Sequence, residues 1–199
     1  MPAPSQVSII NLALSHVAQK PIVAITDLSP QALAAMRIWD SSLRETLRAG
    51  TPGFATTVIA LALHATYVPL HWLFVYQYPA NCLAMNKVYN AGTTDPTVGE
   101  PFRELYNPVD NSKVIVTDCD GAYGEYTYLV ADTNLFDSSF VTALGYRLAA
   151  DLAVPLVGDK DLATQMIKLF NVAASECSRL NVYEQNTETQ QKSAFLDAR

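Results

Sequence analysis

The chain has 199 residues, of which 50% are hydrophobic and 16% are charged, and its formal net charge is −6. This length and apolar content exclude a disordered protein and predict one domain, or one domain with an inserted subdomain. Because no cluster of Lys and Arg accompanies the acidic charge, sequence-specific DNA binding is not expected. The low charged fraction fits extensive protein–protein contact, or equally a surface rich in Ser, Thr and Asn.

Two helices are predicted before residue 54. The first spans residues 5–18, where Ser5 can cap the start and the apolar residues recur at helical spacing (Val7, Ile10, Leu14 and Val17). Ser29 followed by Pro30 predicts the start of the second helix, because proline is favoured at the first helical position, and Gly50 predicts its end. The expected apolar stripe of this second helix consists of Met36, Trp39, Leu43 and Leu47.

The sequence changes character between residues 54 and 131, where runs of Thr, Val, Ile, Tyr and Phe alternate with Pro, Gly, Asn and Asp. This pattern is typical of strands and turns. Six strands are predicted, at residues 56–63, 72–78, 84–89, 102–106, 113–117 and 125–130. The last two flank the turn-forming stretch 118–124, which predicts that they pair as a hairpin.

An uncharged stretch within this region raises the question of a membrane span. Residues 58–76 are strongly apolar, and no formal charge occurs between Arg48 and Lys87. A spanning helix needs about 20 predominantly apolar residues. Here Pro69 interrupts the run, and β-forming residues stand on both sides of it. The stretch therefore predicts two buried strands joined by a turn.

Two further helices are predicted after residue 131. Asp137 or Ser138 can cap the first, which is closed by Pro155 and Gly158, and its apolar residues repeat every four positions (Phe140, Leu144, Leu148 and Leu152). Asp159 can cap the second, which continues to about residue 183 with a predicted apolar face of Leu162, Met166, Leu169, Ala173, Cys177 and Leu180. The short turn between these helices predicts antiparallel packing.

The last part of the chain differs from everything before it. Residues 184–193 contain no apolar side chain, so nothing there is expected to anchor to a core. The layout as a whole predicts an α+β fold. Its parts are a four-helix bundle of residues 1–53 and 132–184, an inserted antiparallel β-rich lobe at 54–131, and an extended C-terminal tail at 185–199.

Few residues suggest chemistry. Cys82 shares the predicted β lobe with His64 and His71, so a Cys/His pair is conceivable, but no glycine elbow or helix start frames the cysteine. Three cysteines without a CxxC spacing argue against a disulfide framework and against a zinc site (Cys82, Cys119 and Cys177).

The acidic residues of the predicted β lobe are interpreted as turn and surface residues and not as a metal or catalytic site. Asp118 and Asp120 resemble part of a calcium loop, but the third ligand and the bidentate glutamate are missing, so a turn is favoured. Glu100 and Glu104 flank Arg103 and are interpreted as surface charge. The sequence therefore predicts no catalytic residue, no metal site and no cofactor site.

Aromatic residues concentrate in the predicted β lobe (Trp72, Phe74, Tyr76, Tyr78, Tyr89, Tyr106, Tyr123, Tyr126 and Tyr128). Tyr and Trp are favoured at protein–protein interfaces, because they bury a large area with little loss of entropy. Alternation along strands should place about half of such residues in a core. Both interpretations remain open from the sequence.

Five stretches occur in an order and spacing that match a known family, namely residues 7–15 (VSIINLALS), 25–29 (ITDLS), 44–55 (RETLRAGTPGFA), 78–83 (YPANCL) and 132–153, which begins DTNLFD. They closely resemble tail tubular protein A, the head-to-tail adaptor (connector) family of podoviruses. The resemblance covers residues 5–183, and its most specific part is 132–153. Gly53 stands where the family usually has Trp, and Asn81 where Asp is common.

The resemblance implies a non-enzymatic structural protein of a bacteriophage virion. It implies a ring, twelve-fold in relatives, that joins the portal protein to the tail nozzle protein and continues the DNA ejection channel without sequence-specific binding. No membrane and no cofactor are implied, and assembly would take place in the host cytoplasm. By analogy the C-terminal tail docks on the portal, and we expect Phe195 and Leu196 to be its apolar contacts and Arg199 a polar one.

Two other classes of function stay as alternatives. The first is a virion-associated hydrolase that uses Cys82 or a carboxylate pair. The second is a membrane-active ejection protein that inserts residues 58–76. A large assembly in solution would favour the adaptor, turnover by a stable monomer would favour the enzyme, and dependence on detergent would favour the membrane protein.

Overall fold

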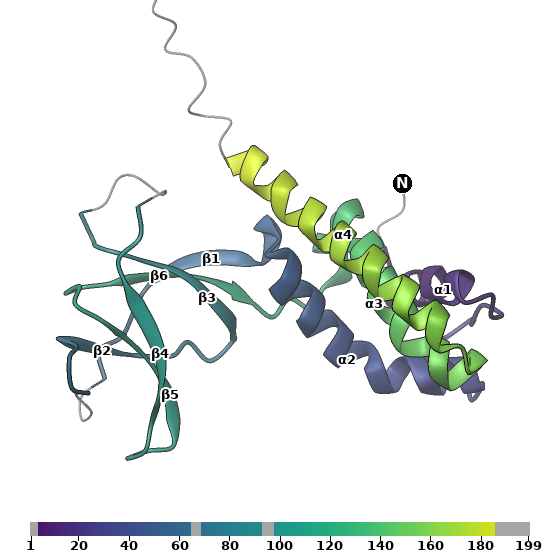
Figure 1. The fold of residues 1–199 in the computed structure, drawn as a ribbon, viewed down its shortest axis with the longest axis horizontal. Helices are drawn as coiled ribbons and strands as arrows, with labels where there is room; N and C mark the ends of the chain where they lie inside the picture. The colour runs from purple at the N-terminus through teal and green to yellow at the C-terminus, as the bar shows by residue number, and fades with distance from the viewer. Residues whose placement is uncertain (1–3, 65–68, 93–97, 186–199) are drawn as a thin grey trace, which may run out of the picture. The chain divides into compact units, whose positions relative to one another are not determined.

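A computed structural model describes residues 4–64, 69–92 and 98–185. These residues form an α+β protein with four α-helices and two three-stranded antiparallel sheets, which confirms the predicted class (Figure 1). The chain divides into two compact units, one of residues 1–54 and 132–199 and the other of residues 55–131. We call them the helical unit and the β unit. Phe195, Leu196 and Arg199, the expected portal contacts, lie outside the described residues.

The first two helices begin at the caps that the sequence predicts. Helix α1 spans Gln6–His16, and Ser5 and Ser8 cap its start reciprocally, each side chain bonding the other residue's backbone N–H. Helix α2 spans Pro30–Gly50 after the cap residue Ser29. It ends in a left-handed residue, which is Thr51 and not the glycine before it.

The two C-terminal helices are also closed by local signals. Helix α3 spans Ser138–Val157 and is capped by Asp137, whose Oδ1 accepts a hydrogen bond from the backbone N–H of Phe140 at 2.7 Å. Gly158 ends α3 with a φ of 77°, a conformation that glycine adopts without strain. Helix α4 spans Lys160–Gln185, and Asp159 accepts hydrogen bonds from two N–H groups of its first turn.

Helix α3 lies at the centre of the helical unit and contacts α1, α2 and α4, while α4 also contacts α2 (Figure 1). Its predicted stripe is fully buried (Phe140, Leu144, Leu148 and Leu152). At Gly145 an added Cβ would lie 3.0 Å from the Leu12 side chain, so the absence of a side chain lets α1 approach α3 closely. The apolar composition of α3 is therefore explained by burial on several sides.

The predicted stripes of α2 and α4 are partly wrong. In α2, Met36 is exposed, and the buried residues are Ala32, Ala35, Ser42, Leu43, Thr46, Leu47 and Gly50. In α4, Leu169 and Leu180 are exposed, and the buried face consists of Met166, Phe170, Ala174 and Cys177. Each helix carries more apolar residues than one contact can cover, and the contacts with α3 determine which of them are buried.

The described residues of the β unit form six strands, close to the positions predicted. One sheet has the order β1-β6-β3 and the other the order β2-β5-β4, and every pairing is antiparallel. Their bounds are Thr56–Ala60 (β1), Phe74–Gln77 (β2), Cys82–Tyr89 (β3), Phe102–Asn107 (β4), Ser112–Thr117 (β5) and Tyr123–Tyr128 (β6).

The predicted hairpin of the last two strands is wrong, because β5 and β6 belong to different sheets. The chain between them crosses from one sheet to the other. Buried Tyr76 holds this crossing, since its hydroxyl donates to the carbonyl of Cys119 at 2.8 Å and accepts from the N–H of Ala122 at 3.2 Å. Sequentially adjacent strands β4 and β5 form a hairpin instead.

The two sheets share one core. Backbone hydrogen bonds join the segment at residues 62–64 to β2, and another joins Glu100 to Val88 of β3, so the sheets are connected at two places. Their facing side chains form a single apolar cluster (Leu61, Tyr76, Met85, Val88, Ile115, Cys119, Ala122 and Tyr126). Several aromatics of the β unit therefore serve the core, whereas Tyr106 and Tyr123 are exposed.

The segment considered for a membrane span contains strands. Within residues 58–76 the structure describes 58–64 and 69–76, which include most of β1 and part of β2. One described helix, α3, is long and apolar enough to cross a membrane by length and composition. Half of its apolar stretch is buried, and it packs against three other helices, so its composition fits the core helix of this unit.

Candidate functional site

Cys82, the conceivable nucleophile, lies at the start of β3 and interacts with Tyr78. Partial burial raises the pKa of the Cys82 thiol, which favours the unreactive protonated form. His64 bonds to Asp110, and His71 is an exposed turn residue with a φ of 77°. The described contacts therefore do not bring Cys82 together with a histidine base.

A charged cluster surrounds Tyr78 between strands β4 and β5. The Nζ atom of Lys113 lies 2.5 Å from a carboxylate oxygen of Glu104 and 4.1 Å from the centre of the Tyr78 ring. The Tyr78 hydroxyl donates to the other carboxylate oxygen of Glu104 at 3.2 Å. Burial raises the pKa of Tyr78 well above its usual value. The cluster thus pairs its charges internally and joins the end of β2 to the β4–β5 hairpin.

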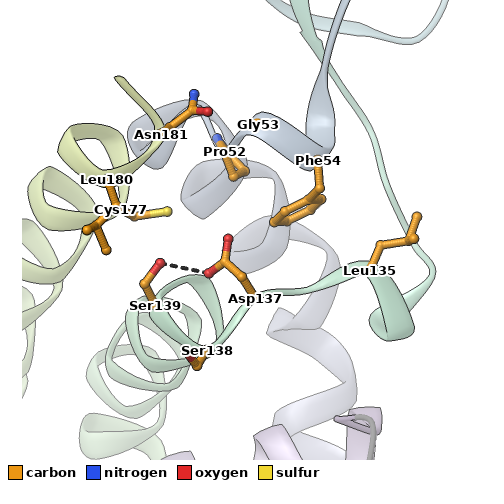
Figure 2. Close-up of a pocket in the computed structure, with 10 residues that line it drawn as sticks. All are labelled: Pro52, Gly53, Phe54, Leu135, Asp137, Ser138, Ser139, Cys177, Leu180 and Asn181. Carbon is orange, nitrogen blue, oxygen red and sulfur yellow. Dashed lines mark hydrogen bonds between the residues drawn. The ribbon is translucent and has the colours of Figure 1, made fainter. Parts of the chain in front are cut away.

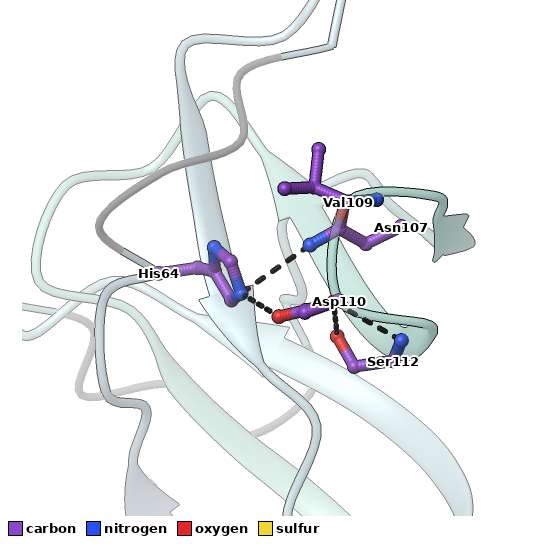
Figure 3. A network of polar contacts seen from close by, with 5 residues as sticks. All are labelled: His64, Asn107, Val109, Asp110 and Ser112. Atoms are coloured by element: carbon purple, nitrogen blue, oxygen red, sulfur yellow. Dashed lines mark hydrogen bonds and ion pairs between the residues drawn. The ribbon is translucent and has the colours of Figure 1, made fainter.

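His64 belongs to a second polar network of the β unit, shown in Figure 3. Its Nε2 atom lies 2.8 Å from Oδ2 of Asp110 and 3.4 Å from Nδ2 of Asn107. The other carboxylate oxygen of Asp110 accepts hydrogen bonds from the hydroxyl and the backbone N–H of Ser112. Among the described residues Nδ1 of His64 is buried without a partner. The network joins residues 62–64 to the β4–β5 turn, and in the described part of the chain the His64 ring bonds Asp110 and Asn107 and not the hydroxyl of Ser112.

Asp110 is expected to make the stability of the β unit depend on acid pH. Hydrogen bonds from Ser112, and then from His64, lower the pKa of this carboxyl group. Because the pKa of Asp110 is lower in the folded than in the unfolded protein, its ionised carboxylate stabilises the fold. This contribution is fully present above the pKa of an unfolded aspartate, about 3.9, and is lost as the pH falls through the pKa of the folded protein. The Asp110→Asn variant should therefore lose less stability than the parent protein between roughly pH 5 and pH 3.

The chain has two tryptophans, and Trp72 is the one in the β unit, so a Trp39→Phe background lets fluorescence report the unfolding of that unit alone. The acid dependence of its stability is then measured as the urea concentration at the unfolding midpoint at each pH. Asp120→Asn, which removes an exposed carboxylate of the same unit, is the matched control. Equal acid sensitivity of Asp110→Asn and the parent protein would contradict the assigned role of Asp110.

The remaining candidates of the sequence are separate from one another. Glu104 pairs with Lys113, while the N–H of Glu100 bonds Val88. Asp118 accepts a hydrogen bond from the N–H of Leu73 at 3.0 Å, as part of the crossing between the sheets. In the described parts of the chain no group of three or more His, Cys, Asp or Glu side chains could hold a metal ion.

The helical unit contains a hollow that the sequence analysis did not predict (Figure 2). Its volume is about 340 Å³, and three segments line it: the residues that follow α2, the segment that leads into α3 with the first residues of that helix, and the last part of α4. The residues are Pro52, Gly53, Phe54, Leu135, Asp137, Ser138, Ser139, Cys177, Leu180 and Asn181. Because these segments are distant in sequence, no local pattern could reveal that they meet.

Local contacts hold the walls of this hollow. Asp137 is used as a helix cap, since its Oδ1 accepts from the N–H of Phe140 and from the Ser139 hydroxyl. Asn181 donates to the carbonyl of Thr51 at 2.8 Å. A Cβ at Gly53 would lie 2.5 Å from Oδ1 of Asn181, so a larger side chain at this position would require the Asn181 side chain to move. Leu135 and Leu180, which are 52% and 42% exposed, contribute apolar surface to a lining that is otherwise largely polar.

A further apolar surface follows one side of α4. Leu169, Val172 and Leu180 are exposed, with Val172 at 64%. At 100° per residue these three lie within a sector of about 80° beside the face that packs on α3, and exposed Glu176 lies in the same sector. We call them the α4 stripe. Exposed apolar side chains gathered on one side of a helix fit a protein–protein contact, here one that also includes the charge of Glu176.

The charges of the β unit are mostly acidic. Residues 55–131 contain seven Asp and Glu against three Lys and Arg. Such a unit repels the phosphates of nucleic acid.

No protein-family model matches the sequence, and no curated protein matches it.

Proposed function

We propose that the protein is a structural subunit of a short-tailed phage particle that assembles into a head-to-tail adaptor ring. The ring is twelve-fold, joins the portal protein to the tail nozzle protein in the neck of the virion, and continues the DNA ejection channel. It assembles in the host cytoplasm without a membrane or a cofactor. The four helices act as a bundle that carries the contacts between copies, and the tail at residues 185–199 contacts the portal through Phe195, Leu196 and Arg199.

The observation that carries this proposal is the α4 stripe. Helix α4 already buries one apolar face against α3, yet it leaves Leu169, Val172 and Leu180 exposed next to that face. A ring subunit needs a surface for its neighbour, and exposed apolar side chains beside a buried helix face suit such a contact. The low charged fraction of 16% supports the same interpretation.

The polar groups of the β unit support a structural role. The acids Asp110 and Glu104 are occupied in hydrogen bonds and ion pairs that join neighbouring segments. Burial raises the pKa values of the Cys82 and Cys119 thiols, which makes both poor nucleophiles. The acidic charge of this unit suits a conduit through which DNA must slide without being held.

The double variant Leu169→Lys with Val172→Lys tests the α4 stripe. We expect it to remain folded and to lose ring formation, because two charges would have to be buried in the contact between copies. Ring formation is measured by electron microscopy of necks assembled on portal-bearing heads, with light scattering of the released complex.

The matched control is Thr164→Lys with Asn171→Lys, which adds the same charge at two exposed polar positions of α4 outside the stripe. Normal rings from the stripe variant would contradict the assigned contact. Deletion of residues 186–199 tests the portal contact separately, and undiminished attachment to portal-bearing heads would refute a role of the tail.

A further inference from the structure

We infer that three arginines of helix α2 bind an acidic surface on the β unit of a second copy of this chain. The arginines, which we call the α2 arginines, are Arg37, Arg44 and Arg48. The acidic surface, which we call the acid patch, consists of Glu100, Asp118 and Asp120. The inference rests on the proposed adaptor role and deepens it, because it names the charged part of the contact between neighbouring copies.

The α2 arginines share one side of their helix. At 100° per residue they lie within a sector of about 40°, opposite the residues that α2 buries. All three side chains are exposed, and no acidic residue lies within the sector. Exposed Asp40 stands beside it, but in the described part of the chain no ion pair joins Asp40 to an arginine. This side of α2 is therefore a cationic surface.

These cations have no anionic partner within the described residues, where the arginine ion pairs are those of Arg147 and Arg179. Arg44 and Arg48 are four residues apart, and like charges at this spacing repel each other on a helix. The helix dipole accounts for Arg48, which stands in the last turn, but not for Arg37 and Arg44. Because arginine is enriched in contact surfaces, an anionic protein surface is the partner that suits this side of α2.

The acid patch lies where the chain crosses between the two sheets. Phe102 of β4 pairs with the last residue of β5, and this antiparallel register places Glu100 across from residues 118–120. Burial raises the pKa of the Cys119 thiol, and the carboxylates of Glu100 and Asp120 raise it further. Both carboxylates therefore lie near the same thiol, so the patch is compact.

The carboxylates of the acid patch form no ion pair in the part of the chain that the structure describes. Glu104, in contrast, pairs with Lys113. Asp118 and Asp120 are exposed, and Glu100 is half-buried. Asp118 uses one oxygen to hold the crossing between the sheets. Three anions of the β unit thus match three cations of the helical unit in number and in their lack of an ionic partner.

Charge complementarity favours a second copy as the partner of the α2 arginines. The two surfaces belong to different units of the chain, so a contact between them is heterologous and can close into a ring. Nucleic acid is also anionic, but the chain has a net charge of −6, and its β unit contains seven acidic against three basic residues. Those charges repel phosphates. Every further copy, in contrast, presents an acid patch to the α2 arginines.

Charge reversal on α2 tests the contact. In the full chain, Arg44→Glu with Arg48→Glu should weaken self-association at low ionic strength at least about tenfold, because it places anions against the acid patch. Self-association is measured by light scattering and sedimentation over a series of protein concentrations. The matched control is Lys20→Glu with Lys160→Glu, which makes the same change in net charge at two exposed lysines of the helical unit outside α2. The control should associate like the parent protein.

Reversal of the acid patch separates a specific contact from damage to the fold. Glu100→Lys with Asp120→Lys should weaken association to a similar extent, and Asp118 is kept because it bonds the N–H of Leu73. The protein with all four changes has opposite charges across the contact again. Its association should return to within about threefold of the parent protein, because the two pairs of changes are coupled. An unfolded variant would not be rescued in this way.

A cross-link locates the contact directly. Arg44→Lys with Arg48→Lys keeps the charge and supplies amines that a carbodiimide can join to a carboxylate in contact with them. The reaction is carried out on an equal mixture of isotope-labelled and unlabelled copies, and the products are mapped by mass spectrometry. We expect amide links from positions 44 and 48 to the acid patch, with one labelled and one unlabelled peptide in about half of them, as random pairing of two copies requires.

Four results would overturn the inference: a parent protein that stays monomeric at low ionic strength, unchanged association after charge reversal on α2, absence of rescue, or amide links confined to one chain. Binding of double-stranded DNA that is lost on charge reversal while self-association persists would assign the α2 arginines to nucleic acid instead.

The inference and the adaptor role fail in different ways. Normal rings on portal-bearing heads from the variant Arg44→Glu with Arg48→Glu refute the inference and leave the adaptor role intact. Rescuable, charge-dependent association of a parent protein that does not attach to such heads refutes the adaptor role and leaves the contact between copies.

Discussion

Replacing Phe140 by alanine is expected to lower the free energy of unfolding of the helical unit by about 3–5 kcal/mol. Phe140 is 0% exposed and lies at the start of α3. Its ring packs edge to face on Phe54, with 5.1 Å between ring centres, and on Phe136, with 4.8 Å. The substitution would remove both aromatic contacts and leave a cavity that the helices cannot close without moving.

Urea unfolding of the full chain in a Trp72→Phe background would measure this loss, because Trp39 then reports the helical unit. Val172→Ala removes an apolar side chain that is mostly exposed, and should cost less than about 0.5 kcal/mol. A loss below about 1 kcal/mol for Phe140→Ala would show that this aromatic cluster does not support the unit.

The second large effect is expected at Arg147, which joins three helices. One of its terminal nitrogens lies 2.9 Å from Glu45 of α2 and 3.1 Å from Asp151 of α3. Its guanidinium lies 5.8 Å from the centre of the Phe170 ring of α4. Asp151 also accepts a hydrogen bond from Ser42, which is fully buried. Removal of Arg147 therefore leaves two carboxylates close together without their cation.

We expect Arg147→Ala to cost about 2–3 kcal/mol, somewhat less than a fully buried ion pair because the side chain retains partial exposure. With Asp151→Asn already present, the same change should cost at least about 1 kcal/mol less, since the two residues interact directly. Arg179→Ala serves as the control, because the pair of Arg179 with Glu176 is exposed on α4. Additive costs of Arg147→Ala and Asp151→Asn would contradict the network.

Much of the local structure could be predicted from the sequence. The caps Ser5, Ser29, Asp137 and Asp159 stand where the four helices begin. These signals act over three or four residues, because the first N–H groups of a helix have no acceptor within the helix and a nearby side chain supplies one. The six strands also lie near their predicted positions, because β-branched and aromatic runs between turn residues have few other structures available.

Strand pairing was less predictable. The stretch around Gly121 has turn character, which favoured a hairpin, but the chain instead crosses between two sheets at this point. Hydrogen bonds from Tyr76 hold the crossing, and Tyr76 is more than forty residues away in sequence. A turn sequence permits both outcomes, and a distant side chain selects one.

The sequence by itself determined where the four helices begin, approximately where the six strands lie, and which residues form the buried stripe of α3. Only the tertiary structure decided that Leu169 and Leu180 remain exposed while Phe170 is buried, and that segments around Gly53, Asp137 and Cys177 enclose a hollow. The physical reason is the distance along the chain over which each kind of interaction acts. Caps and periodicity act between neighbours in the chain, whereas burial depends on which surfaces meet after the chain has folded.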